Sequence, residues 1–174
     1  LAATFYFQGI FVMSLFPHVD WSRNASIYEV NVRQYTPEGT LTAMAAHLPR
    51  LQKMGVSILW FMPIQPIGQL KRKGGLGSYY AIADHTAVNP EFGTMADFRS
   101  LVQQAHALGM KVILDWVANH TAWDHVWTRQ HPEWYLKNDK GEIHSYLYDN
   151  GTEIEDWSDV CGLDYKNPSL WPAM

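Results

Sequence analysis

The residues best suited to chemistry are Asp115, Asn119 and His120, which follow a short apolar run, Val112 to Leu114. Such a continuous run, with Gly109 before it and a carboxylate after it, is typical of a strand buried on both faces. Asp115 would then stand at the carboxyl end of the strand, where parallel α/β proteins carry their ligand-binding loops. The alternative is that Asp115 only caps a turn, because Asp is a common turn residue.

Further blocks of sequence accompany this one in a fixed order. They are Tyr-x-x-x-Asp at 80–84 leading into Val-Asn-Pro-x-Phe-Gly-Thr at 88–94, Asp-x-x-x-Asn-His at 115–120, and Leu-Asp-x-x-Asn-Pro at 163–168, with a fourth block at 56–63. Together they resemble the α-amylase family of glycoside hydrolases. The resemblance covers residues 24–172, and the ordered set is more specific than any one block.

The resemblance implies roles for three side chains. Tyr80 would stack on the sugar at the cleavage subsite, His120 would hydrogen-bond that sugar, and Asp115 would be the active-site support carboxylate. Taken without the family, Tyr80 reads as a core tyrosine and His120 as a structural histidine. A buried Asp115 needs a donor or cationic partner; in the family this is an Arg on the fourth strand, which this sequence does not contain. Asp84 is expected to hold nearby loops through hydrogen bonds.

The resemblance also places a calcium ligand at Asn119, through its side-chain oxygen. Calcium takes about six to eight oxygen ligands. Where the family has a further Asp ligand, this chain has Gly162, and that departure counts against a complete calcium site.

The reaction implied by the resemblance is retaining hydrolysis or transfer at α-glucosidic bonds, with starch or maltooligosaccharides as substrates. It uses a carboxylate nucleophile and a carboxylic acid about 5 Å apart. In the family these groups and a third Asp lie on the fourth, fifth and seventh strands, which are absent here. We therefore expect an α-glucan hydrolase chain that is truncated and lacks the catalytic trio. The alternative is a non-catalytic glucan-binding or scaffold half-barrel.

The order of elements predicts an α/β fold, namely a partial (β/α)₈ barrel with its first three βα units. A helix should begin after a capping box at Thr94 and Asp97, and Pro49 should bend or restart an earlier helix. The expected strands are 27–33, 56–62 and 111–115, the expected helices are 41–54 and 95–108, and a long loop at 64–83 lies at the functional end.

The domain organisation follows from these elements. Residues 1–12 resemble a protease-site remnant of an expression tag and are set aside as a leader. Residues 13–120 are the first half of the barrel. Residues 121–174 are the truncated start of an irregular small domain inserted in the barrel, with a short strand at 142–147.

Composition indicates a soluble globular chain that is 47% hydrophobic and carries a net charge of -4. Its basic residues are scattered, apart from Lys71 to Lys73, which we expect in a solvated loop, so neither a nucleic-acid partner nor a membrane partner is indicated. The single cysteine, Cys161, excludes an intrachain disulfide and leaves the compartment undecided. Three strands cannot close a barrel, so a homodimer or higher homo-oligomer is expected to cover the open side.

Overall fold

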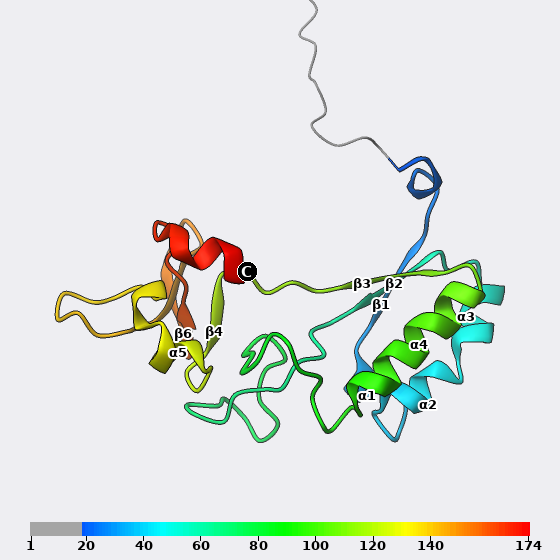
Figure 1. The fold of residues 1–174 in the computed structure, drawn as a ribbon, viewed down its shortest axis with the longest axis horizontal. Coiled ribbons are helices and arrows are strands. Elements are labelled where there is room, and N and C mark those ends of the chain that lie inside the picture. The colour runs from blue at the N-terminus through cyan, green and yellow to red at the C-terminus, as the bar shows by residue number, and fades with distance from the viewer. Residues whose placement is uncertain (1–18) are drawn as a thin grey trace, which may run out of the picture.

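The computed structural model describes residues 19–174, and the leader expected at 1–12 lies outside this range. The chain forms a parallel sheet with helices against it and, nearer the C-terminus, an antiparallel sheet (Figure 1). The parallel part contains β1 (Ile27–Val30), α1 (Val32–Tyr35), α2 (Leu41–Ala45), α3 (Leu48–Lys53), β2 (Ile58–Phe61), α4 (Met95–Ala107) and β3 (Lys111–Leu114), after a 3₁₀ helix η1 (Asp20–Ser22). The antiparallel part contains β4 (His120–Ala122), α5 (Trp127–Gln130), η2 (Pro132–Trp134), β5 (Ser145–Asp149), β6 (Ile154–Gly162) and η3 (Pro168–Ala173).

The parallel sheet has the order β1-β2-β3, so each strand lies beside the next one along the chain. Helices α2, α3 and α4 gather on one side of it (Figure 1). Leu59 and Phe61 of β2 are buried in the same core as Leu101 and Ala105 of α4. Burial of this apolar surface is the main force that holds the helices on the sheet. No helix within residues 19–174 combines the length and the apolar character needed to cross a bilayer.

Local signals in the sequence set the ends of these helices. α2 ends at Ala45, and after two intervening residues α3 begins at Leu48 with Pro49 in its first turn, which confirms the expected break. The capping box is also confirmed, because the Thr94 side chain accepts from Asp97 N while Asp97 accepts from Thr94 N at 2.8 Å. After α4, Gly109 takes φ +80°, a conformation that glycine adopts without strain.

Three expectations about strands are corrected. The first strand ends at Val30 rather than at 33, because the chain turns into the short helix α1. The strand expected at 142–147 is β5, which begins only at Ser145. The strand before Asp115 is not buried on both faces, since Ile113 is 44% and Leu114 40% exposed. β3 lies at the edge of its sheet, and nothing within the described range covers its outer side.

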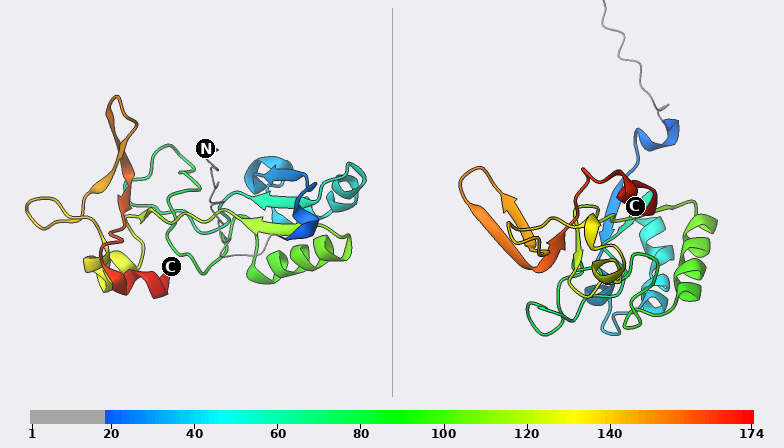
Figure 2. Two further views of the ribbon diagram at one scale, coloured as in Figure 1. Left: turned by 90° about the horizontal axis from the view of Figure 1, so that it is seen from above. Right: turned by 60° about the vertical axis from the view of Figure 1, so that its left-hand side comes forward.

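The expected irregular segment after residue 120 instead contains an antiparallel sheet of order β4-β6-β5. β6 is nine residues long, and its start projects with β5 as a hairpin (Figure 2). The first half of β6 has no alternation of apolar and polar residues, which is why the sequence pattern did not reveal it. His120 of β4 lies opposite Gly162 of β6 in this sheet.

The long loop expected at 64–83 is confirmed, and it packs against the antiparallel sheet. Oδ2 of Asp124 accepts hydrogen bonds from the backbone N–H groups of Gln69 at 2.7 Å and Leu70 at 3.2 Å. Gly68 stands so close to Ala122 that a side chain on it would overlap the Ala122 methyl group. The loop is therefore anchored at its middle, before it reaches Tyr80.

The basic residues 71–73 lie in a loop as expected, with Lys71 and Lys73 exposed, and each also makes a contact that the composition did not indicate. Lys71 Nζ lies 3.2 Å from the centre of the Trp123 ring, a cation–π contact. Arg72 donates to the backbone oxygens of Gly68 and Ile67. Lys73 pairs with Asp159 at 3.3 Å. Each residue thus helps to hold the loop in place, and two of them bind it to the antiparallel sheet.

Candidate functional site

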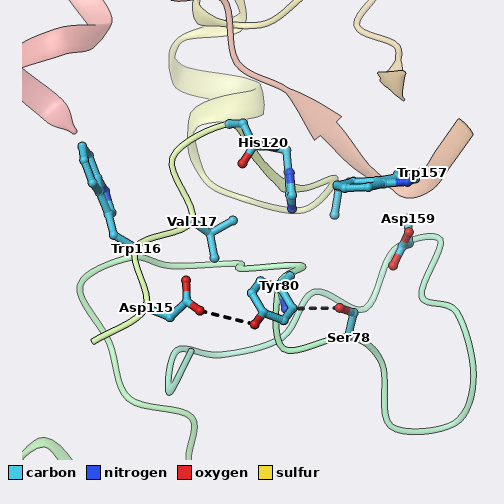
Figure 3. A pocket seen from close by; sticks show the side chains of 10 residues that line it. Ser78, Tyr80, Asp115, Trp116, Val117, His120, Trp157 and Asp159 are labelled. Atoms are coloured by element: carbon cyan, nitrogen blue, oxygen red, sulfur yellow. Dashed lines mark hydrogen bonds between the residues drawn. The ribbon is translucent and has the colours of Figure 1, made fainter. Parts of the chain in front are cut away.

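A cavity of about 440 Å³ lies where the end of β3 meets the long loop and strands β4 and β6. Its walls include Tyr80 from the loop, Asp115 and Val117 from the segment after β3, His120 from β4, and Trp157 and Asp159 from β6. Figure 3 shows the His120 ring pointing towards Tyr80, whose hydroxyl is directed at Asp115, and all three residues line the same cavity. Three residues chosen from the sequence, Tyr80, Asp115 and His120, are therefore brought together.

Asp115 follows β3 directly, and its backbone N–H donates to Phe61 O at 2.9 Å, which continues the pairing with β2. The Tyr80 hydroxyl donates to Oδ2 of Asp115 at 3.3 Å (Figure 3). Tyr80 thus supplies the donor that the carboxylate was expected to need. Burial raises the pKa of Tyr80, and the negative charge and hydrogen bond of Asp115 raise it further, so the hydroxyl stays protonated.

His120 is buried, with 4% of its surface exposed. Burial lowers the pKa of His120, although the Tyr80 backbone and the charge of Asp159 oppose that shift, so the ring is neutral near pH 7. Within residues 19–174, its Nδ1 atom has no hydrogen-bond partner. That nitrogen is itself buried, and it is the ring of His120 that lines the cavity. A neutral imidazole can bind a hydroxyl as donor or acceptor, according to its tautomer.

Asn119 also lines the cavity, and its backbone oxygen accepts from Leu163 N at 3.0 Å. Gly162, on the strand beside it, offers no side-chain oxygen. Residues 19–174 contain no group of three His, Cys, Asp or Glu side chains arranged to hold a metal ion. Calcium takes about six to eight oxygens, which include amide and backbone carbonyl oxygens as well as carboxylates. The calcium ligand at Asn119 thus remains an expectation of the resemblance alone.

Asp84 lies in the loop beyond Tyr80 and does not line the cavity. Its Oδ1 accepts from the backbone N–H and the hydroxyl of Thr86, at 2.8 and 2.7 Å. Burial opposes ionisation, but these hydrogen bonds hold the pKa of Asp84 below its usual value. The structural role expected for Asp84 matches this geometry.

Two histidines, His85 and His125, connect the loop after Tyr80 to the antiparallel part of the chain. Nδ1 of His85 lies 3.1 Å from Nε2 of His125, and Nε2 of His85 lies 3.3 Å from Val117 O. Nδ1 of His125 accepts from the Trp127 backbone N–H, so the His125 proton must be on Nε2. A single chain of donors then runs from Trp127 through both neutral rings to Val117. Burial and the neighbouring His85 lower the pKa of His125 to about 4.

Sequence reasoning missed Trp157 and Asp159 as walls of the cavity. Trp157 packs against the rings of Tyr148, Tyr146 and His120. Asp159 is 9% exposed and pairs with Lys73. Both lie on β6, whose pairing with β4 brings them to the cavity. No local pattern signals this, since it depends on strand pairing between distant residues.

Comparison with known proteins gives consistent matches. Residues 16–160 match the family model described as alpha amylase, catalytic domain. The chain is 42% identical over 168 residues to an alpha-1,4-glucan:maltose-1-phosphate maltosyltransferase of Rhodospirillum rubrum, a match that covers 86% of this chain and 24% of the relative.

Among solved structures, an α-amylase from Lactobacillus plantarum superposes with a TM-score of 0.78 at 47% identity, covering 87% of this chain and 34% of that one. A maltogenic α-amylase, AmyB, from Thermotoga neapolitana gives 0.77 at 38% identity, with the same two coverages. The chain thus spans about a quarter of the length of the curated relative and about a third of each solved structure.

Proposed function

The chain belongs to the α-amylase family, and from this we propose that it supplies the sugar-binding wall of an enzyme that acts at α-glucosidic bonds of glucans. Within that proposal, residues 13–120 form the first three βα units of a (β/α)₈ barrel, and residues 121–174 begin the small domain inserted after the third strand. The parallel order β1-β2-β3 supports the barrel, because barrel strands are neighbours in chain order.

The observation that carries the proposal is the convergence of Tyr80, Asp115 and His120 on one cavity. They come from a loop, a strand end and a strand of a different sheet. A glucose residue offers hydroxyl groups at its edge and apolar C–H groups on its faces. The Asp115 carboxylate and the His120 imidazole are partners for hydroxyls, and the Tyr80 ring is a flat apolar surface with a polar tip.

Asp115 acts in this proposal as a support for the sugar and for Tyr80. Retaining glycosidases need one carboxylate as nucleophile and a second carboxyl group as acid, about 5 Å apart. The carboxylates that line the cavity here are Asp115 and Asp159, and both are engaged, one by Tyr80 and one by Lys73. We infer that the cleaving groups belong to strands beyond those described.

Hydrolysis and transfer both remain within the proposal. One relative is named as a maltosyltransferase and two solved neighbours as α-amylases. What these names share is an α-glucan or maltose unit, so we propose that class of ligand. Hydrolysis and transfer differ in the acceptor, which is water in the first and a sugar in the second. The described cavity does not distinguish these acceptors.

The second candidate function is glucan binding without catalysis. It is favoured for the 174 residues by themselves because the proposal gives both carboxylates of the cavity, Asp115 and Asp159, roles in binding and not in cleavage. For the 174 residues by themselves, the purified chain is incubated with maltotetraose, with Asp115→Asn as the control. Sugar release above buffer that the substitution abolishes would contradict the inference that the cleaving groups lie elsewhere, whereas binding without release agrees with it.

Binding itself is tested by titrating methyl α-glucoside into the chain and following amide shifts by NMR. We expect saturable shifts at the cavity, and at least about tenfold weaker binding in Tyr80→Ala and His120→Ala. Trp171→Ala is the matched control, because this exposed aromatic residue does not line the cavity. Equal binding by all variants, or none by the parent chain, would refute the proposal.

A further inference from the structure

The β6 side of the cavity contains two side chains to which the roles above assign nothing. Figure 3 shows Asp115 and Asp159 on opposite sides of Tyr80, with Trp157 above Asp159. The cavity therefore extends past the position that the proposed function gives to a sugar at Tyr80, Asp115 and His120. Its far end is lined by an indole ring and a carboxylate.

Trp157 is held firmly in its orientation. Its ring lies 5.1 Å from that of Tyr148 in a stacked arrangement and 5.8 Å from that of His120 at 90°. Its Nε1–H donates to Oε2 of Glu155 at 3.1 Å. A ring fixed in this way loses little further freedom when a ligand packs on it, which favours binding.

Asp159 is a charge in a largely buried position, with 9% of the residue exposed. Lys73 contacts its Oδ1 atom at 3.3 Å, and Lys73 itself remains 54% exposed in its side chain. Within residues 19–174, no further hydrogen bond to this carboxylate is present beside that ion pair. A nearly buried carboxylate with acceptor capacity left over is suited to receive hydroxyl groups.

We propose that Trp157 and Asp159 bind a second α-linked glucose residue, adjacent to the one held by Tyr80 and His120. The apolar face of that residue packs on the indole, and its hydroxyls donate to Asp159. Lys73 is a positioning residue that holds the carboxylate against β6. This inference rests on the proposed function and names two residues that set its preference for oligomers over single glucosides.

A purely structural role for Asp159, joining the loop to β6, makes a different prediction. Loss of the ion pair would then weaken all ligands equally, through the loop that carries Tyr80. A second-sugar role affects maltose but leaves methyl α-glucoside nearly unchanged. The ratio of the two dissociation constants is therefore the informative quantity.

The experiment titrates maltose and methyl α-glucoside into the 174-residue chain and into two variants, Asp159→Asn and Asp156→Asn. Asp156 is exposed on the same strand and does not line the cavity, so its variant is a matched control for charge. We expect the parent and the control to bind maltose about tenfold more tightly than methyl α-glucoside. In Asp159→Asn this preference should fall to about threefold or less.

Trp157→Phe gives a second, independent readout, since a smaller ring keeps the aromatic cluster but reduces the contact area. It should also lower the preference for maltose. An unchanged preference in both variants overturns the second-sugar site while leaving the binding of single glucosides, and hence the proposed function, intact. No binding of either sugar by the parent chain overturns both.

Discussion

The hydroxyl of Tyr80 lies 3.3 Å from Oδ2 of Asp115, although 35 residues separate the two in the sequence. One residue is on a loop anchored to the antiparallel sheet, and the other follows the edge strand of the parallel sheet. The contact therefore joins the two parts of the molecule at the cavity. It also orients the Tyr80 ring, to whose face the proposal assigns a sugar.

Two substitutions of Tyr80 distinguish the contribution of its hydroxyl from that of its aromatic ring. Tyr80→Phe should lower the free energy of unfolding by about 1 kcal/mol, because Asp115 loses a donor, yet weaken methyl α-glucoside binding by less than about threefold. Tyr80→Ala should weaken binding by more than about tenfold. Denaturant unfolding and NMR titration measure the two effects. Equal losses of binding in both variants would show that the hydroxyl, and not the ring, binds the sugar.

The histidine chain predicts how stability depends on pH. The pKa values of His85 and His125 are lowered in the folded state, that of His125 to about 4. The unfolded chain therefore takes up these protons first as pH falls. The stabilising contribution should be complete above about pH 6.5 and lost as pH falls towards about 4, a decrease of about 2 kcal/mol.

The nearby carboxylates Asp84 and Asp124 favour a proton on His125, so they reduce this loss of stability at low pH. The variant His125→Gln should show a smaller decrease in the free energy of unfolding between pH 7 and pH 4. His106→Gln, an exposed histidine on α4, is the control and should keep the parent slope. A parent slope in His125→Gln would show that the ring pair is not the group responsible.

Anchoring of the long loop depends on Asp124, which accepts two backbone hydrogen bonds from Gln69 and Leu70. Asp124→Ala should destabilise the fold by about 2 kcal/mol and speed hydrogen exchange at those two amides. Asp139→Ala, at an exposed site without such contacts, should do neither. Unchanged exchange at 69 and 70 in Asp124→Ala would contradict the anchoring role.

The exposed side of β3 predicts self-association of the 174-residue chain. Ile113 and Leu114 are 44% and 40% exposed, and within residues 19–174 no strand pairs with the outer edge of β3. Such edges pair readily with other chains. Light scattering at micromolar concentration should show dimers or larger species. Ile113→Lys should shift the chain towards monomer, whereas Met54→Lys, also at an exposed apolar site, should not. A monodisperse parent monomer would refute this prediction.

The sequence predicted those elements whose signals are local. The structure has the helix break expected at Pro49, the cap expected at Thr94 and Asp97, and the helix end expected at Gly109. Each of these signals acts only on the neighbouring turn of backbone. Tyr80, Asp115 and His120 were found through ordered motifs. The structure adds that they share a cavity, while their individual roles stay predictions.

Features that depend on distant partners were missed. Trp157 and Asp159 reach the cavity only because β6 pairs with β4. Lys73 is exposed as expected, but its ion pair with Asp159 was not foreseen. The exposure of Ile113 is of the same kind, since the apolar run around it does not reveal which strand lies at the edge of the sheet. In each case, pairing between segments that are remote in the sequence determines where the residue lies.

The central claim is that Tyr80, Asp115 and His120 form one binding wall for an α-linked glucose residue. A crystal structure of the chain soaked with maltose tests it most directly. The account predicts one glucose residue against the Tyr80 ring, with its hydroxyls bonded to Asp115 and His120. Maltose bound elsewhere on the chain, with this cavity holding only water, would contradict it.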